Sequence, residues 1–332
     1  MRSSSVLFAI VLGASTDAAG EETHRLQLDL GFTGSFGGVI HGPPKPIPTP
    51  GSFGVVPYTW QRWSVSPSAG ASLFLRPLHE DDAPPSLQPF LQRTPELWVK
   101  AAASWWGQDF STGEQDRYEQ IGATLGASGY VTRWLWLTGS AGATTLTSES
   151  VRSYPPSFFV SHRWTVPLSA GVGVRLRDVL LRLDYSNKIE WWAIIGKPYE
   201  TLDPVKGDVR LSVRAVLQRR IDLNAYAEIV DQATGASGGM GLFAQWFVRP
   251  RTGPFAGFEY WATEPGSGSS TEQHEVRVRA GITHWWTGRL GLTVLLLSDW
   301  SGRPHFPSIG VGGSRIFDWI DGRLAAELHA RW

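Results

Sequence analysis

The stretch that decides the fold is VGVRLRDVLLRLDYSNKIEWW, from Val172 to Trp192, which contains a turn at Arg177–Asp178. After this turn, apolar and polar residues alternate, and a period of two is typical of a β-strand with two opposite faces. One face would carry Val179, Leu181, Leu183, Tyr185, Ile189 and Trp191, and the other Arg182, Asp184, Ser186, Lys188 and Glu190. In a soluble sheet the apolar face packs inward, whereas in a membrane barrel it faces lipid.

Composition restricts the possible classes of protein. The chain has 332 residues, of which 18% are charged, and its formal net charge is zero. This balance argues against a nucleic-acid partner, which requires a basic surface. No run of about 18 apolar residues is present that could form a membrane-spanning helix. The 37 glycines and 17 tryptophans suit a protein of many turns and closely packed strands that uses amphipathic aromatic side chains.

The N-terminal segment has the features of a secretory signal peptide. Arg2 precedes a short apolar run, VLFAIVLG, and the following ASTDAAG offers small residues for cleavage. We therefore predict that residues 1–20 are a signal peptide and that residues 21–332 form a single domain exported from a bacterial cytoplasm. A frayed N-terminal strand is the alternative interpretation. The chain has no cysteine, and therefore neither a lipid-attachment residue nor a disulfide.

Amphipathic segments of the same kind follow one another along the rest of the chain. Their connections alternate between tight turns and longer loops, which is the pattern of an up-and-down barrel with turns in the periplasm and loops outside. One connection is an exception, because Pro77–Thr94 is long where a short turn is expected. The predicted strands are Arg25–Phe32, Trp63–Leu75, Leu97–Trp105, Ile121–Ala127, Leu135–Thr145, Val160–Leu176, Val179–Trp191, Val209–Leu217, Leu223–Ile229, Met240–Val248, Phe255–Trp261, Val276–Ile282, Leu290–Leu296 and Leu324–Trp332.

The number of strands is chosen so that it is even. Single-chain bacterial barrels have even numbers of strands, and Ser308–Phe317 is short and rich in glycine, so we assign Ser301–Asp321 to a long final loop. The predicted fold is an all-β, transmembrane, antiparallel up-and-down β-barrel of about fourteen strands, with twelve or sixteen as alternatives. Sixteen would require Ser308–Phe317 and a strand inside the loop Ser35–Val56. Further long loops are predicted at Gly107–Arg117, Ser148–Ser157, Gly196–Lys206, Asp231–Gly239 and Pro265–His274.

Three observations favour the membrane assignment of the faces. Many segments have nine or more residues, close to the roughly 9–11 that cross a bilayer. Most tryptophans lie at segment ends, where a membrane interface accommodates their half-apolar rings. The last segment alternates and ends in the aromatic Trp332. Because a cation that points at mid-bilayer lipid costs roughly 2–4 kcal/mol, the arginines of these strands must face a lumen and the apolar residues must face lipid.

Together these features resemble the bacterial outer-membrane β-barrel class, which includes the porins, over nearly the whole chain after residue 20. The resemblance implies the outer membrane of a Gram-negative bacterium, contact with outer-membrane lipid and lipopolysaccharide, and insertion by the barrel-assembly machinery through the C-terminal strand. Two features depart from the class. One is the long connection Pro77–Thr94, and the other is the pair of prolines inside strands, Pro67 and Pro167, each expected to mark a bulge or a strand rim.

No motif in the sequence predicts a catalytic, metal or cofactor site. GASGG at Gly235–Gly239 places Ser237 in a nucleophile motif, but that motif requires a strand–turn–helix elbow, and we expect a flexible loop here. The eight histidines show no paired metal-binding spacing. Ser161–His162 and His305 with Ser308 could serve a hydrolase at the outer rim, yet adjacent strand residues point to opposite faces. We therefore expect no enzymatic activity, no metal and no cofactor.

The predicted lumen carries the functional information. Neighbouring strands bring opposite charges together, which could line a hydrated pore or fill a closed barrel with salt bridges. Fourteen strands make a wider barrel than the roughly eight whose side chains fill the interior, and this favours a pore. The residues expected to line it are Arg182, Asp184, Lys188, Glu190, Arg210, Arg214, Asp222, Glu228, Arg277 and Arg279.

The leading functional hypothesis is a porin-like channel for small hydrophilic solutes. One alternative is a non-conducting structural or adhesive barrel that works through its surface loops, and another is a lipid or peptide hydrolase at the rim. The non-membrane alternative is a secreted β-propeller or sandwich that binds glycans, although a propeller would repeat about every 40–50 residues and no such repeat is present.

Overall fold

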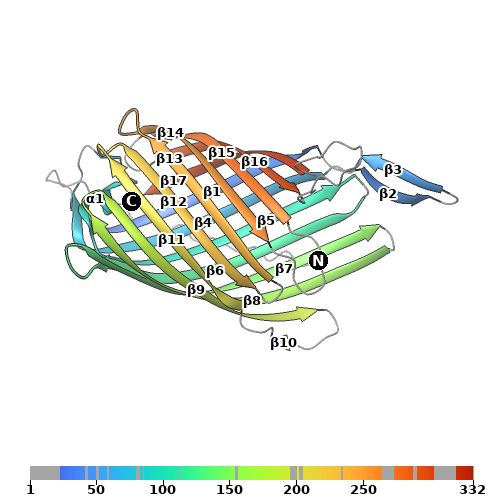
Figure 1. Cartoon of the computed structure of the whole chain (residues 1–332), viewed down its shortest axis with the longest axis horizontal. Helices are drawn as coiled ribbons and strands as arrows, with labels where there is room; N and C mark the ends of the chain where they lie inside the picture. Colours follow the sequence, from blue (N-terminus) through green and yellow to red (C-terminus); the bar gives the residue numbers. More distant parts are fainter. Residues whose placement is uncertain are drawn as a thin grey trace, which may run out of the picture.

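In the computed structural model, the chain forms a β-barrel whose strands run obliquely to its long axis (Figure 1). The structure describes residues 23–41, 44–49, 52–57, 60–79, 83–84, 86–111, 113–153, 156–194, 200–201, 205–232, 235–263, 273–286, 290–302 and 319–331. Fourteen strands in these ranges make up the barrel wall. They are β1 (Thr23–His41), β4 (Trp60–His79), β5 (Glu96–Phe110), β6 (Gln115–Tyr130), β7 (Leu135–Ser153), β8 (Pro156–Leu176), β9 (Val179–Ile194), β11 (Val205–Leu217), β12 (Ile221–Gln232), β13 (Gly235–Trp246), β14 (Thr252–Thr263), β15 (Gln273–Trp285), β16 (Leu290–Gly302) and β17 (Trp319–Arg331).

The barrel is antiparallel and closed. Each wall strand pairs with its neighbours along the chain, and the last strand, β17, pairs with the first, β1, in a register that sets Leu328 opposite Phe32. Closure is required because an open edge would leave unpaired N–H and C=O groups in the hydrocarbon. The predicted fold class is therefore confirmed, and each of the fourteen predicted segments overlaps one wall strand.

The alternatives of twelve and sixteen strands are wrong. Within the predicted loop Ser35–Val56 the structure does contain strands, because β2 (Pro44–Thr49) pairs with β3 (Ser52–Pro57). These two form a separate sheet and do not join the wall. Their hairpin projects from the end of the barrel opposite the short helix α1 (Gln88–Gln92) (Figure 1). Ser308–Phe317 lies outside the described residues. The remaining strand, β10 (Glu200–Thr201), pairs with the edge of β9.

The strands continue further at the loop end than their apolar alternation predicts. The long loops expected at Gly107–Arg117, Ser148–Ser157 and Asp231–Gly239 are therefore wrong. Beyond the bilayer a strand no longer needs an apolar face, so polar segments continue the ladder without the signal that predicts it. The observed limits are Phe110 and Gln115 for β5 and β6, Ser153 and Pro156 for β7 and β8, and Gln232 and Gly235 for β12 and β13.

The two strand prolines do not produce the expected bulges, and neither lies at a strand end. Beside Pro67 the pairing of β4 with β5 lapses between Val65↔Trp105 and Ser68↔Ala102, and it resumes in the same register. Pro167 interrupts the pairing of β8 with β7 in the same way. On the other side of each strand the pairing is unbroken at the proline, with Phe32 opposite Pro67 and Lys188 opposite Pro167. Because proline lacks the N–H that a ladder uses, it interrupts bonding on one side without adding a residue.

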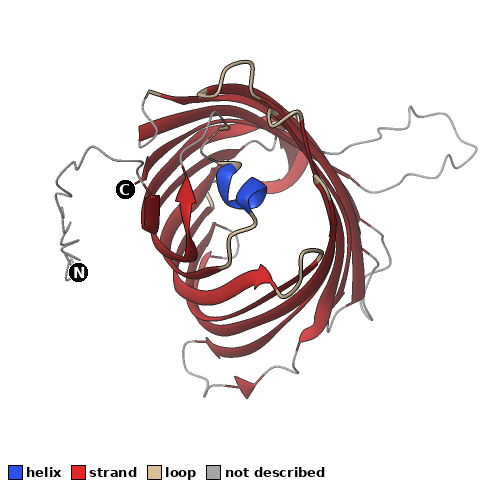
Figure 2. Cartoon of the chain, turned by 90° about the vertical axis from the view of Figure 1, so that its left-hand side faces the viewer, coloured by secondary structure: helices blue, strands red, loops and turns tan. Residues whose placement is uncertain are grey.

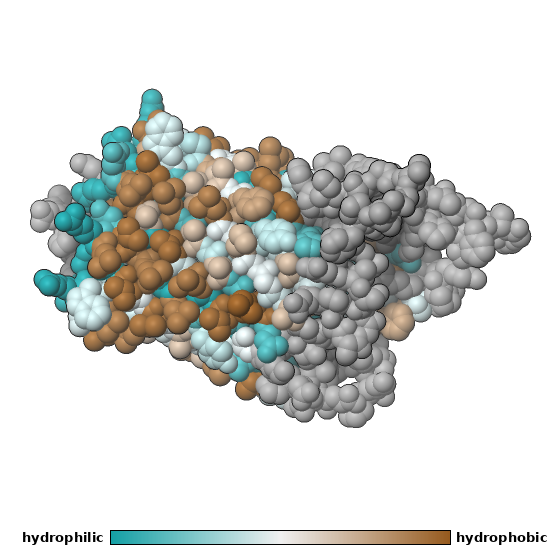
Figure 3. Space-filling view, in the orientation of Figure 1, coloured by the Kyte–Doolittle hydropathy of each residue, from teal (hydrophilic) through white to brown (hydrophobic). Residues whose placement is uncertain are grey.

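The apolar faces of the wall strands point outward. Leu181, Leu183 and Leu211 are 46–48% exposed, and Val172, Val174 and Val213 are exposed as well. Figure 3 shows apolar residues over the outer surface of the barrel, next to a hydrophilic rim at the end where the short turns lie. The amphipathic strands therefore have the orientation of a membrane barrel and not that of a soluble sheet.

The tryptophans form a membrane girdle only in part, which corrects the expectation from their positions in the sequence. Trp134 and Trp286 are 47% and 50% exposed, but Trp285 is 5% exposed. Trp136 packs against a buried cluster inside the barrel. Trp285 and Trp286 are adjacent on the chain, so one ring points inward and the other outward.

Some predicted features lie outside the described residues, namely the signal segment 1–20, the central part of the final loop and Trp332. The described part of the chain contains no helix with the length and apolar character that a membrane crossing requires.

Single spin labels test the two faces, because the chain contains no cysteine that would compete for labelling. In Leu181→Cys and Leu211→Cys the label should be accessible to oxygen dissolved in lipid. In Arg182→Cys and Arg210→Cys it should be accessible to a water-soluble relaxation agent. The measurement is electron paramagnetic resonance of the barrel in lipid vesicles. Reversed accessibility at both pairs would contradict the assignment of the faces.

Candidate transport pathway

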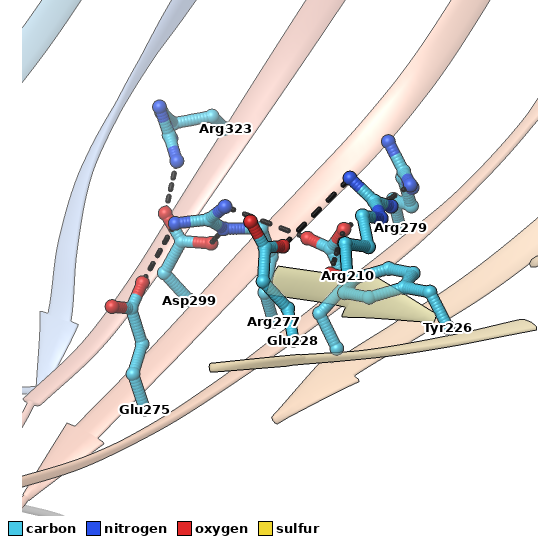
Figure 4. Close-up of polar contacts among 9 residues, drawn as sticks. Arg210, Tyr226, Glu228, Glu275, Arg277, Arg279, Asp299 and Arg323 are labelled. Atoms are coloured by element: carbon cyan, nitrogen blue, oxygen red, sulfur yellow. Dashed lines mark hydrogen bonds and ion pairs between the residues drawn. The ribbon is translucent and has the colours of Figure 1, made fainter. Parts of the chain in front are cut away.

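Charged side chains form a band on the inner face of β11 to β17 (Figure 4). At one end of this band Arg210 lies 3.8 Å from Glu228, the residue directly opposite it on the neighbouring strand. At the other end Arg323 of β17 forms an ion pair with Asp299 of β16. We call these charged residues, together with the neutral Tyr226 that connects them, the charge band. Its members are Arg210, Tyr226, Glu228, Glu259, Glu275, Arg277, Arg279, Asp299 and Arg323.

Arg277 is the centre of the charge band. Its guanidinium donates hydrogen bonds to Asp299 at 2.9 Å, to Glu275 at 2.8 Å and to Glu259 at 3.4 Å. Asp299 is only 9% exposed, and an unpaired buried charge would destabilise the fold by roughly 3–5 kcal/mol. Because each partner lies on the same strand or on a neighbouring one, these side chains extend along the wall and do not cross the lumen.

Tyr226 of β12 connects the two parts of the charge band that lie on either side of β13. Its hydroxyl donates a hydrogen bond to Glu259 Oε1 at 3.0 Å, although β13 separates their two strands. Gly241 of β13 lies opposite both residues in the register, and a Cβ at this position would collide with the Tyr226 ring. The Arg210 guanidinium lies 3.8 Å from the centroid of the same ring. Glycine at position 241 therefore leaves the space through which Tyr226 reaches Glu259.

All ten residues predicted to line a lumen lie on described wall strands, and each forms an ion pair. Four of them belong to the charge band, namely Arg210, Glu228, Arg277 and Arg279. The other six form smaller clusters. That the ten residues line an open pore stays a prediction. The smaller clusters are Arg182–Asp184 at 2.7 Å, Arg214–Asp222 at 2.8 Å, and Glu190 with Lys188 at 3.4 Å and Arg163 at 3.8 Å.

The ten predicted residues did not include four acidic or basic members of the charge band, namely Glu259, Glu275, Asp299 and Arg323. Glu259 follows the exposed Phe258 directly, so the same alternation that places Phe258 outside could have placed Glu259 inside. Asp299 and Arg323 lie just beyond the apolar segments used to predict β16 and β17. Neither could be included, because the apolar signal ends before the strand does.

The predicted long connection Pro77–Thr94 begins inside β4, which ends at His79, and its described residues 86–94 fold into the turn end of the barrel. Its helix α1 lies within the ring of strands in the axial view (Figure 2). Leu87 and Phe90 are 1% and 9% exposed. They pack against Leu180 of β9, Val216 of β11 and Phe247, which follows β13. We call residues 86–94 the plug. The exception in the turn pattern is thus a folded element that occupies part of the lumen.

Two arginines of the wall hold Phe90 in the plug. Arg175 is 3% exposed, donates a hydrogen bond to the Phe90 carbonyl oxygen and lies 4.0 Å from the centroid of the Phe90 ring. Arg214 approaches the same ring to 4.7 Å while it binds Asp222 through two nitrogens. A desolvated cation–π contact contributes about 2 kcal/mol. The plug is therefore anchored to β8 and β11.

Beside the plug the barrel contains a cavity of about 620 Å³. Its lining comes from a continuous run of neighbouring wall strands, with β13 to β17 at one end of the run and β1, β4 and β5 at the other, together with Ser86 of the plug. The side formed by β1, β4 and β5 includes small residues such as Gly31, Ser68 and Ala102. The part formed by β13, β14 and β15 includes the aromatic residues Phe243, Phe255 and Trp285, which line the same space.

Other candidate chemistries find little support among the described residues. Ser237 lies in strand β13 and not in the expected loop, and its hydroxyl donates a hydrogen bond to Thr263. A strand that continues past the serine differs from the elbow that a nucleophile requires. Ser161 bonds Ser148 while His162 bonds Thr147, so the two do not contact each other. In the described ranges no three metal-ligating side chains form a group.

Comparison with protein-family models and with curated protein sequences gives no match. Solved structures share the architecture of the barrel. The toluene transporter TbuX of Ralstonia pickettii has a TM-score of 0.56 at 9% identity, over 92% of this chain and 88% of that chain. The CymD monoaromatic hydrocarbon channel has a TM-score of 0.54 at 9% identity, over 93% and 88%. The toluene transporter TodX of P. putida has a TM-score of 0.52 at 8% identity, over 92% and 88%.

This chain is a bacterial outer-membrane β-barrel. The closed wall of fourteen strands and the exposed apolar outer surface agree with that assignment. At such low identity the likeness concerns the fold of the barrel. The hydrocarbons named for TbuX, TodX and CymD are properties of those proteins.

The substitution Gly241→Ala should destabilise the barrel. The added Cβ would displace the Tyr226 ring and break its hydrogen bond to Glu259, and such overpacking costs about 1–3 kcal/mol. The free energy of unfolding can be measured by urea titration in lipid vesicles. Gly238→Ala on the same strand is the matched control, because no atom lies within 4 Å of its added Cβ. Equal unfolding free energies for the two variants would contradict the role assigned to Gly241.

Proposed function

We propose that this outer-membrane barrel is a porin-like channel for small hydrophilic solutes. The observation that carries the proposal is the cavity of about 620 Å³ beside the plug, whose lining includes charged, hydroxyl and amide side chains. A polar solute that leaves water needs hydrogen-bonding groups to replace its hydration, and these side chains can provide them. The cavity would then be the narrow part of the path through the barrel.

The pairing of the wall charges supports an interior that is not filled by salt bridges. Arg277 and Asp299 lie on neighbouring strands, as do Arg210 and Glu228. Charges that are satisfied along the wall need no partner on the far side of the lumen. A wall of fourteen strands also encloses more space than the roughly eight-stranded barrels whose side chains fill them.

The plug would set the width of the channel at the turn end. Phe90 and Leu87 are buried against β9, β11 and the end of β13, so they occupy one side of the lumen. The cavity adjoins the plug at Ser86. A solute would therefore pass beside the plug, between it and the wall formed by β1, β4 and β5.

A structural or adhesive barrel is the second candidate function. The β2–β3 hairpin projects beyond the barrel at the end opposite the plug (Figure 1), where it could contact another surface. The proposal includes no enzymatic step, because Ser237 is engaged with Thr263 inside the wall.

Reconstitution in planar lipid bilayers tests the channel. The purified barrel should give discrete conductance steps in potassium chloride, because a hydrated path past the plug admits small ions. Its folded state can be verified beforehand by heat-modifiable migration on a detergent gel. Folded protein that gives no steps would overturn the channel and favour the adhesive candidate.

Removal of the Phe90 side chain tests the plug. Phe90→Ala loses the buried ring and both guanidinium contacts, and a change of this kind in a core costs about 3–5 kcal/mol. The weakened plug should raise the mean single-channel conductance. Phe258→Ala is the matched control, because Phe258 is 44% exposed on the outer face of β14 and touches no part of the plug. An unchanged conductance in Phe90→Ala would contradict a narrowing role for the plug.

A further inference from the structure

One row of small residues on three neighbouring strands helps to leave the cavity open. Gly31 of β1, Ser68 of β4 and Ala102 of β5 lie side by side in the register. A Cβ on Gly31 would lie 2.5 Å from the Ser68 hydroxyl, so even a methyl group would not fit there without displacing Ser68. Larger side chains on these strands would fill the space that faces the plug.

The part of the lining formed by β13, β14 and β15 includes three aromatic rings. The rings of Phe243 and Phe255 lie 5.6 Å apart in a tilted arrangement. Trp285 reaches over Gly291 and stacks on His329 at 5.8 Å. Aromatic side chains in such offset or tilted arrangements are good partners for another planar ring. This part of the lining therefore favours a ligand that contains an aromatic ring.

The charges around the cavity balance. Asp29 and Glu327 contribute two negative charges, and Lys100 and Arg279 contribute two positive charges. A ligand with a net charge would meet as many repulsive as attractive groups. A pure hydrocarbon would offer no hydrogen bond to Ser68 and Gln245, whose polar groups require partners in a confined site. The lining is thus best matched by a ligand that is neutral overall and carries a hydrogen-bonding group.

We propose that the cavity binds a small, neutral, hydroxylated aromatic solute of the phenol class as it passes through the barrel. The ring would lie against Phe243, Phe255 and Trp285, and the hydroxyl would bond to the polar side chains of the small-residue side. This inference rests on the proposed channel function and names its substrate class. A volume of about 620 Å³ lies within the roughly 300–1,000 Å³ of typical small-molecule sites.

Fluorine NMR of para-fluorophenol with the full-length barrel in detergent tests the inference without any need for conductance. The signal should broaden in the presence of the barrel, with a dissociation constant of roughly 1 mM for so small a ligand. Phenol should displace it more effectively than cyclohexanol, benzoate or benzene. Equal displacement by cyclohexanol would overturn the role of the aromatic rings, and stronger displacement by benzoate or benzene would overturn the choice of a neutral, hydroxylated ligand.

Two variants locate the binding. Ala102→Phe would fill the cavity and should weaken the binding of para-fluorophenol at least about tenfold. Phe255→Leu removes a ring and keeps an apolar side chain, so it should weaken binding about threefold to tenfold, the range expected for one aromatic contact. Ala123→Phe is the matched control, because Ala123 is exposed on the outer face of β6. This control also corrects for partition of the ligand into detergent. Equal binding by Ala102→Phe and Ala123→Phe would overturn the site.

The binding and conductance measurements can fail independently. Conductance steps without binding of para-fluorophenol would overturn this inference and leave the channel intact. Saturable binding that Ala102→Phe abolishes, in a barrel without conductance, would support the site and overturn the channel.

Discussion

Every backbone N–H and C=O group inside the hydrocarbon of a bilayer must find a hydrogen-bond partner within the protein, and the rest of this structure depends on that constraint. It explains why β17 returns to β1. The cost of charged side chains in lipid adds the second condition, that the apolar faces point outward. The need for backbone partners also limits what the prolines can do. Pro67 and Pro167 each interrupt pairing on one side of a strand, while the pairing on the other side is unbroken at the proline, so the wall remains continuous around them.

Within the closed wall, the inner surface is shaped by where glycine and small residues fall. Gly241 lets the Tyr226 ring extend to Glu259, so a single glycine joins the charges of β12 to those of β14 and β15. On β1, β4 and β5, the small residues Gly31, Ser68 and Ala102 border the cavity. Small inner residues thus have two effects. In one part of the wall they make room for a continuous polar network, and in another they leave an open volume.

The plug covers apolar residues that point inward from the wall near the turns. Leu180, Val216 and Phe247 point inward and are 0–5% exposed because Leu87 and Phe90 cover them. Without this cover each would face water, and burial of such a side chain contributes roughly 1.5–3 kcal/mol. The long turn therefore serves the stability of the barrel as well as the shape of the lumen. This double role links the packing of the turn end to the proposed path of the solute.

The sequence by itself determined the strand segments, the closed barrel and the faces, because alternation along one strand is a local property that a bilayer makes unambiguous. It also led to the prediction that the ten charged residues line a lumen, and this stays a prediction. It did not determine which charges meet, because the pairing of Tyr226 with Glu259 depends on the glycine of a third strand. The lengths of the strands beyond the bilayer, the fold of Pro77–Thr94 into the lumen and the cavity beside it were decided by the tertiary structure. The strand ends continue as backbone ladders through polar segments that carry no apolar signal. The plug and the cavity depend on side chains from strands far apart in the sequence, and their volumes and contacts leave no periodic signal along the chain.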